Sequence, residues 1–415
     1  MNPILNHPIP FTVMMLVLLA VARVFGELME RFNQPAIIGE LLAGFILGPS
    51  VLNYINVDEQ LKVLSELGVF LLVILAGLEI QADEIKKTMW GRNIWTVIMG
   101  FVIPMVGGFS VGMLFHLNLL VSMFIGLCVS ITALPVSVRI LMDLGKLNTP
   151  IGRKIISVAM SNDLVAFLIL GIIIDMNGHI TTLEDFFKSF FVTLVKISLF
   201  ITVIFASFRF FRWIDQSFST FHLRLQRLIS LLKGKESLFA MVIVFVLVFA
   251  SIAELLGLHF VIGAFFGAVL LNKNILGRSN FRKIKENTSS ITMGFLAPIF
   301  FAYMGVQFNV QSLGGSWGLL ISVLFAGIIF KLVGGYFGGR LSGMDQQSSL
   351  TLGIGLNARG IMELLVASIG LRYGFIDITV YSILVVMGIT TTVLSPYFLK
   401  MSFNRIDRKA LAVKI

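Results

Sequence analysis

The chain has 415 residues, of which 57% are hydrophobic and only 13% are charged, with a mean hydropathy of +0.94. Soluble domains carry about 25% charged residues, so this composition excludes a soluble globular protein and predicts a chain solvated by lipid. The formal net charge of +10 fits basic cytoplasmic loops of a membrane protein and not a nucleic-acid partner. The single cysteine, Cys128, excludes disulfides, and no cofactor is expected.

Hydrophobic runs between charged or turn residues predict an all-α polytopic membrane protein with thirteen transmembrane helices. Most of the 32 Lys and Arg residues fall in loops on one side, which places the N-terminus outside and the C-terminus in the cytoplasm of a cell (inner) membrane protein. The basic stretch 212–235 is expected to lie on the anionic inner surface. The predicted spans are 10–28, 34–53, 60–80, 93–115, 118–142, 150–175, 187–210, 236–255, 257–273, 287–308, 316–341, 347–371 and 377–402.

An internal repeat joins the two halves of the chain. VGGFSVGML at 106–114 matches VGGYFGGRL at 333–341, an offset of 227, and AGLEI at 76–80 matches MGVQF at 304–308. The offset is a step of seven spans, and because seven is odd, the second copy runs through the membrane upside down. Two inverted six-helix repeats of this kind are typical of secondary transporters.

Both copies contain an interruption within a long apolar span, TALP at 132–135 and NARG at 357–360. Pro135 removes a backbone donor next to Ala133, and Gly360, which follows Asn357, lets the chain leave helical geometry. Free backbone groups at membrane depth survive only beside a protein- or water-lined cavity. The sequence therefore predicts two crossing broken helices beside a binding site, although Pro135 could also only kink a packed helix.

Ionisable groups are rare in the predicted spans, and such groups mark functional sites in membranes. Asp163, with Asn162 beside it, is expected to bind a proton or a cation, because burial favours the first and a bound cation the second. Lys331 is expected to pair with a carboxylate or to replace the cation. Arg359 and Glu363 are four residues apart, so they can pair on one helix face. Glu79 either flanks an ion entrance or lies at the interface.

These motifs together resemble the monovalent cation:proton antiporter superfamily, in the branch of the Kef-like proteins and the plant cation/H+ exchangers. The resemblance implies a homodimer in which a mobile core moves past a scaffold like an elevator. It implies a scaffold at about 1–80 and 236–308, a core at about 93–175 and 316–403, and a linker helix at about 187–210. The matching segments are QPAIIGELLAGFILGPS, LGVFLLVILAGLEI, SITALPVSVRIL, SNDLVAF and GIGLNARGIMELLVASIG.

The resemblance also implies roles for single residues. Asp163 would bind Na+ or K+ in competition with H+, with Asn162 as its companion and Thr132 as a further oxygen ligand. Lys331 corresponds to the basic residue of the family's core. Many relatives have an acidic residue where this chain has Ala133, and the Asn-Asp pair resembles electroneutral exchangers.

The leading hypothesis is a Na+ or K+/H+ antiporter that works by alternating access around Asp163. A cation channel and a sodium-coupled solute symporter of similar architecture remain alternatives. The channel lacks a recognisable filter segment, and the symporter would need more polar residues in the spans. No enzyme is expected, because the sequence contains no nucleophile–base pair.

Overall fold

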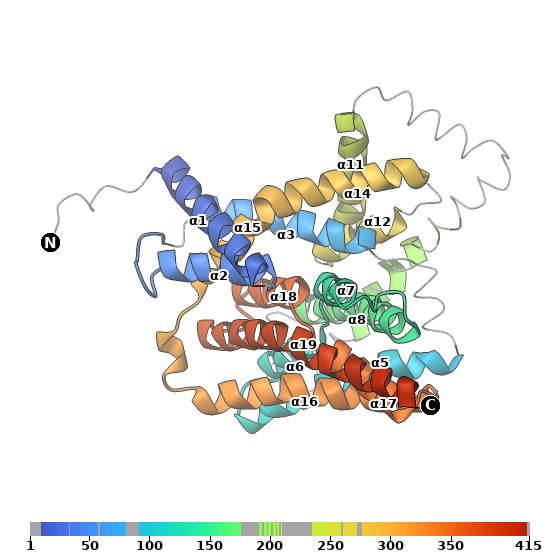
Figure 1. The fold of residues 1–415 in the computed structure, drawn as a ribbon. Helices are drawn as coiled ribbons and strands as arrows, with labels where there is room; N and C mark the ends of the chain where they lie inside the picture. Colours follow the sequence, from blue (N-terminus) through green and yellow to red (C-terminus); the bar gives the residue numbers. More distant parts are fainter. Residues whose placement is uncertain are drawn as a thin grey trace. The chain divides into compact units, whose positions relative to one another are not determined.

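The structure is a computed structural model, which describes residues 10–32, 34–56, 59–79, 91–175, parts of 191–209, 235–258, 260–271 and 276–412. Over these ranges the secondary structure is entirely helical (Figure 1). Eight of the described helices are long and apolar enough to cross a membrane. These observations support an integral membrane protein.

Most predicted spans coincide with helices of the structure. The helices that match one span each are α1 (Phe11–Arg31), α2 (Ala36–Leu47), α3 (Glu59–Glu79), α5 (Ile94–Leu114), α8 (Pro150–Asp175), α11 (Lys235–Leu255), α12 (Phe260–Leu270), α16 (Trp317–Leu341) and α19 (Ile378–Ala412). Between α11 and α12, Gly257 has a φ of +74°, which favours glycine and separates the two helices. The predicted span 187–210 and the stretch 212–235 lie largely outside the described residues, so the number thirteen stays a prediction.

The basic segment 273–285 was expected to be a loop, and this expectation is wrong from Arg278 onward. The chain there forms α14 (Arg278–Ile291), a π-helical segment η3 (Thr292–Leu296) and α15 (Ala297–Gln307). The segment is helical because it is amphipathic: Phe281 and Ile284 are buried while Arg282 is exposed. Charge alone does not end a helix when one face packs.

The chain divides into two compact units, one formed by Met1–Glu66, Glu84–Ala166 and Ala297–Ile415 and the other by Leu67–Asp83 and Phe167–Leu296. The second unit packs tightly at Gly77, where a Cβ would lie 2.6 Å from the Cβ of Ala268. The predicted scaffold and core are functional divisions and stay a prediction.

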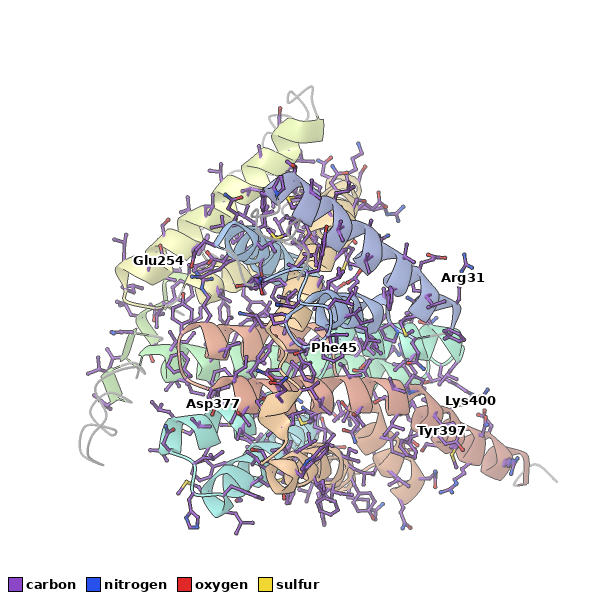
Figure 2. All side chains as sticks on the ribbon, turned by 90° about the vertical axis from the view of Figure 1, so that its left-hand side faces the viewer. Arg31, Phe45, Glu254, Asp377, Tyr397 and Lys400 are labelled. Carbon is purple, nitrogen blue, oxygen red and sulfur yellow. The ribbon has the colours of Figure 1, made fainter. Side chains whose placement is uncertain are left out.

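In the first unit, α5 packs along α16 and along α6 (Leu119–Ser130), and α16 packs along α17 (Gln346–Gly355) (Figure 1). Buried apolar residues of α7 (Leu134–Asp143), α8 and α17 form one cluster with Leu399 and Phe403 of α19. Because Phe403 packs in this cluster, α19 extends beyond residue 402, where the last span was predicted to end. Large side chains also stand exposed on the outside of helices, such as Tyr397 at 63% (Figure 2), as expected for a surface in contact with lipid.

The hairpins α5–α6 and α16–α17 are built alike at the offset of 227 residues. A Cβ on Gly108 would lie 2.8 Å from the Cα of Gly126, and a Cβ on Gly335 would meet the Cα of Gly353 in the same way. Small residues at these positions let the helix backbones approach closely, as is common in membranes. The same offset relates the contact of Gly112 with Ser122 to that of Gly339 with Ser349.

The first turns of α6 and α17 are capped in equivalent ways. The Asn118 side chain accepts from the Val121 amide at 2.7 Å, and the Asp345 side chain accepts from the Ser348 amide at 3.0 Å. Such caps satisfy amides that a helix start leaves free. The two hairpins are thus repeats in contact geometry, while their inverted orientation in the membrane stays a prediction.

Candidate functional site

The first interruption lies between α6 and α7. The backbone is extended at Ile131 (φ −69°, ψ 146°) and Ala133 (φ −79°, ψ 106°). Pro135 lies in the first turn of α7, where a helix does not need the missing amide. The predicted break is therefore present, and the proline starts the second half-helix instead of kinking a continuous one.

The second interruption lies between α17, which ends at Gly355, and α18 (Ile361–Arg372). Gly360 in this break is extended, with φ 165°, so its backbone angle does not require glycine. A Cβ there would lie 2.9 Å from Cγ2 of Val136 and 3.2 Å from Cβ of Ala133. Glycine is thus needed because the second break passes close to the first.

The two breaks hydrogen-bond to each other. The Ala133 amide donates to the Ala358 carbonyl at 2.8 Å, and the Thr132 hydroxyl donates to the Leu356 carbonyl at 3.1 Å. The Asn357 side chain donates to the Ile328 carbonyl of α16 at 3.0 Å. Backbone groups that the interruptions free from helical bonding are thereby satisfied within the protein, as a lipid environment requires.

Two buried cations bind the carbonyl end of α6. Arg359 donates from Nη1 to the Cys128 carbonyl at 2.6 Å and from Nη2 to the carbonyls of Val129 at 2.7 Å and Gly327 at 3.1 Å. Lys331, which is fully buried, donates to the carbonyls of Ser130 and, at 3.1 Å, of Gly100. Positive charge is favourable at this end because the carbonyls carry the negative pole of the helix dipole.

Lys331 was expected to pair with a carboxylate or to replace the cation, and this role stays a prediction. In the structure its Nζ donates hydrogen bonds to two backbone carbonyls. Asp163 and Glu363 act on its charge electrostatically. Ser130 and Gly100 lie 201 and 231 positions from Lys331 in the chain. No sequence pattern marks their carbonyls as acceptors, which is why sequence reasoning missed them.

Asp163 and Asn162 lie in α8, and their exposed fractions are 4% and 0%. The amide nitrogen of Asn162 lies 3.9 Å from the position of a Cβ on Gly100. Both polar atoms of the Asn162 side chain are buried without a hydrogen bond to any described residue. A buried amide with free capacity beside a buried carboxylate offers the oxygen ligands that hard cations prefer.

The expected pairing of Arg359 with Glu363 is present: Nη1 lies 3.5 Å from Oε2, and both side chains are fully buried. Glu79 of α3 pairs with Lys285 of α14 at 3.7 Å in the second compact unit. Its role at an ion entrance stays a prediction. The structure adds Thr392, which sequence reasoning missed and whose hydroxyl donates to the Arg359 carbonyl at 2.6 Å. The run of three threonines at 390–392 in an apolar span was an available signal.

The chain is similar to several curated proteins. It is 28% identical over 390 residues to the Na(+)/H(+)-K(+) antiporter GerN of Bacillus cereus, covering 94% of this chain and 95% of that protein. It is 29% identical to the Cation/H(+) antiporter 15 of Arabidopsis thaliana over 94% of this chain, which is 48% of that longer protein.

The fold is similar to a solved structure, that of the sodium proton antiporter MjNhaP1 from Methanocaldococcus jannaschii at pH 8, with a TM-score of 0.67 and 15% identity. The match covers 95% of this chain and 96% of the other. The model of the transmembrane sodium/hydrogen exchanger family matches residues 15–404. The chain therefore belongs to the transmembrane sodium/hydrogen exchanger family of the monovalent cation:proton antiporter superfamily.

Proposed function

We propose that this protein exchanges Na+ or K+ for H+ across the cell membrane, and that cation and proton compete for Asp163. Family membership and the antiporter names of its relatives support this class of transport. The observation that carries the proposal is the buried carboxylate of Asp163 in α8, in electrostatic contact with Lys331, which holds the end of α6 at the first break. Intramembrane carboxylates in transporters mark ion and proton pathways.

Competition at one carboxylate accounts for coupling. The buried ionic groups around Lys331 are two cations, Lys331 and Arg359, and two acids, Asp163 and Glu363. A proton and a monovalent cation add the same single charge when either one occupies Asp163. One H+ therefore exchanges for one cation, and the transport cycle is electroneutral. Asn162 and Thr132 complete the ligand set through their side-chain oxygens.

Transport further requires that Asp163 face each side of the membrane in turn. We assign this step to an elevator-like motion of the core past a scaffold within a homodimer, with the N-terminus outside. The two broken helices support the assignment, since they hydrogen-bond to each other and Lys331, which binds the end of α6, interacts electrostatically with Asp163.

The test is Asp163→Asn in proteoliposomes that contain a pH-sensitive dye, with the membrane voltage clamped. Na+ or K+ added outside should drive proton movement in the wild type and none in the variant. Glu254→Gln makes the same chemical change at an exposed carboxylate of α11 (Figure 2) and should retain exchange. Exchange that persists in Asp163→Asn, or cation flux without proton movement in the wild type, would refute the proposal.

A further inference from the structure

Glu363 is a buried acid that the exchange reaction at Asp163 does not use. It lies in the first turn of α18, its side chain is fully buried, and its Oε2 approaches Gly388 of α19. Neither carboxylate oxygen receives a hydrogen bond from any residue that the structure describes. An ionised carboxylate in such a place is costly unless donors surround it.

Most donors of the neighbouring cations point to backbone carbonyls and not to Glu363. Three of the five N–H groups of Arg359 point to carbonyls of α6 and α16. Its Nη1 stays 3.5 Å from Glu363, whereas charge-assisted N–H···O bonds measure about 2.7–2.9 Å. Lys331 acts on Glu363 electrostatically but donates to Ser130 and Gly100.

Among the described residues, the hydroxyl donors of α19 near Glu363 are also engaged elsewhere. On α19, the Thr391 hydroxyl donates to the carbonyls of Met387 and Gly388, and that of Thr392 donates to the carbonyls of Gly388 and Arg359. On α6, the buried thiol of Cys128 lies within electrostatic range of the Glu363 carboxyl. The titratable or charged groups that face Glu363 are therefore Arg359, Lys331 and Cys128.

We propose that Glu363 is a second proton site, separate from Asp163, whose proton is held and not exchanged for the cation. In the described arrangement Glu363 is the neutral acid, and Arg359 is free to bind the end of α6. When the proton leaves to water, the carboxylate attracts Arg359, whose Nε is buried and has no hydrogen-bond partner among the described residues. A bidentate pair through Nε and Nη2 then replaces the bonds of Nη2 to the carbonyls of Val129 and Gly327.

Deprotonation of Glu363 also affects the cation site, and this part of the inference rests on the proposed function. Val129 lies in the last turn of α6, shortly before the break that contains Thr132. Loss of the Arg359 bonds loosens this end, so cation binding weakens at alkaline pH. Proton competition at Asp163 weakens it at acidic pH. Cation affinity therefore has a bell-shaped pH dependence with one limb for each acid.

The experiment measures binding of radioactive Na+ to the purified full-length protein across a range of pH. The wild type should show both limbs, and Glu363→Gln, which cannot lose a proton, should lose only the alkaline limb. At the most alkaline pH the variant should bind Na+ about 5-fold or more tightly than the wild type, the size of a typical coupling between sites. Glu254→Gln is the matched control and should keep both limbs.

Infrared spectroscopy gives a second measurement that does not depend on binding. The carbonyl-stretch band of a protonated carboxyl group should persist in Asp163→Asn, disappear in Glu363→Gln and shift in Glu363→Asp. An alkaline limb that is unchanged in Glu363→Gln, or an acid band absent in Asp163→Asn, would overturn the second proton site and leave antiport intact. A wild type that binds Na+ without an acidic limb would instead refute the competition at Asp163.

Discussion

Gly108→Ala tests whether the close approach of α5 and α6 holds the end of α6 in place. The new Cβ would lie 2.8 Å from the Cα of Gly126 and 3.0 Å from Cβ of Val129, and ordinary contacts begin at 3.4 Å. Because the nearest atom, the Cα of Gly126, belongs to the backbone and cannot rotate away, α5 and α6 must separate by about 0.6 Å. Overpacking of this kind costs about 2 kcal/mol, and the better helix propensity of alanine returns about 1 kcal/mol.

The displacement also reaches the buried arginine. The Val129 carbonyl accepts from Nη2 of Arg359 at 2.7 Å, and a shift of about 0.6 Å lengthens this bond beyond the usual range. A hydrogen bond to a charged group contributes about 1.5–3 kcal/mol. With the net packing cost, Gly108→Ala should lose about 2.5–4 kcal/mol of stability and should also slow cation exchange.

Thermal unfolding in detergent and exchange in proteoliposomes measure the two effects. Gly294→Ala is the matched control, because a Cβ there meets no atom within 4 Å. The midpoint of Gly108→Ala should fall by several degrees below that of Gly294→Ala. Equal midpoints and equal exchange rates would show that the spacing of α5 and α6 does not position the end of α6.

Lys331→Met should lower stability by about 1–3 kcal/mol, because the buried carbonyls of Ser130 and Gly100 lose their donor; a thermal midpoint equal to that of the wild type would contradict this role. Asp345→Ala should cost about 1 kcal/mol at pH 7 through loss of the cap of α17. Hydrogen bonds from the side chain and backbone of Ser348 lower the pKa of Asp345 below its usual 3.8. A lowered pKa means that the stabilisation is present above the unfolded-state value and is lost as the pH falls through the folded-state pKa. Chemical unfolding at several pH values should therefore show the difference between wild type and variant vanish in acid; a difference that persists would be inconsistent with the cap.

Local chemistry in the sequence was sufficient to predict the helices and the interruptions. Apolar runs gave the spans, and Pro135 and Gly360 marked the breaks between α6 and α7 and between α17 and α18. The spacing of four residues between Arg359 and Glu363 predicted a contact on one helix face. The contact is present, although Arg359 lies in the break before α18 and only Glu363 lies in the helix.

Contacts through backbone carbonyls were beyond sequence reasoning. Every residue has a carbonyl, so nothing distinguishes Ser130 or Gly100 as the acceptor for Lys331. The error at α14 has a related cause, since charge was interpreted as a loop although Phe281 and Ile284 supply a buried face. In both cases tertiary packing decided what composition could not.

The repeat and the buried charges explain different properties of the molecule. Contacts of small residues are shared by both hairpins at the offset of 227, so they account for two similar breaks that cross. At the positions equivalent to Lys331 and Arg359, the first copy has the uncharged Pro104 and Thr132.

The charge on this repeated backbone is therefore one-sided. Both cations come from the second copy and bind the end of α6 in the first, whereas the Leu356 carbonyl of the second break accepts from the neutral hydroxyl of Thr132. A strictly symmetric pair of breaks would present the same field from both helix ends. Among the described residues, cations bind the end of α6 and none binds the end of α17, so the field at the crossing has a direction. Asp163 in α8 is one of the two acids that act electrostatically on Lys331. The repeat thus explains the shape of the site, and the departures from the repeat explain why the field at Asp163 has a direction.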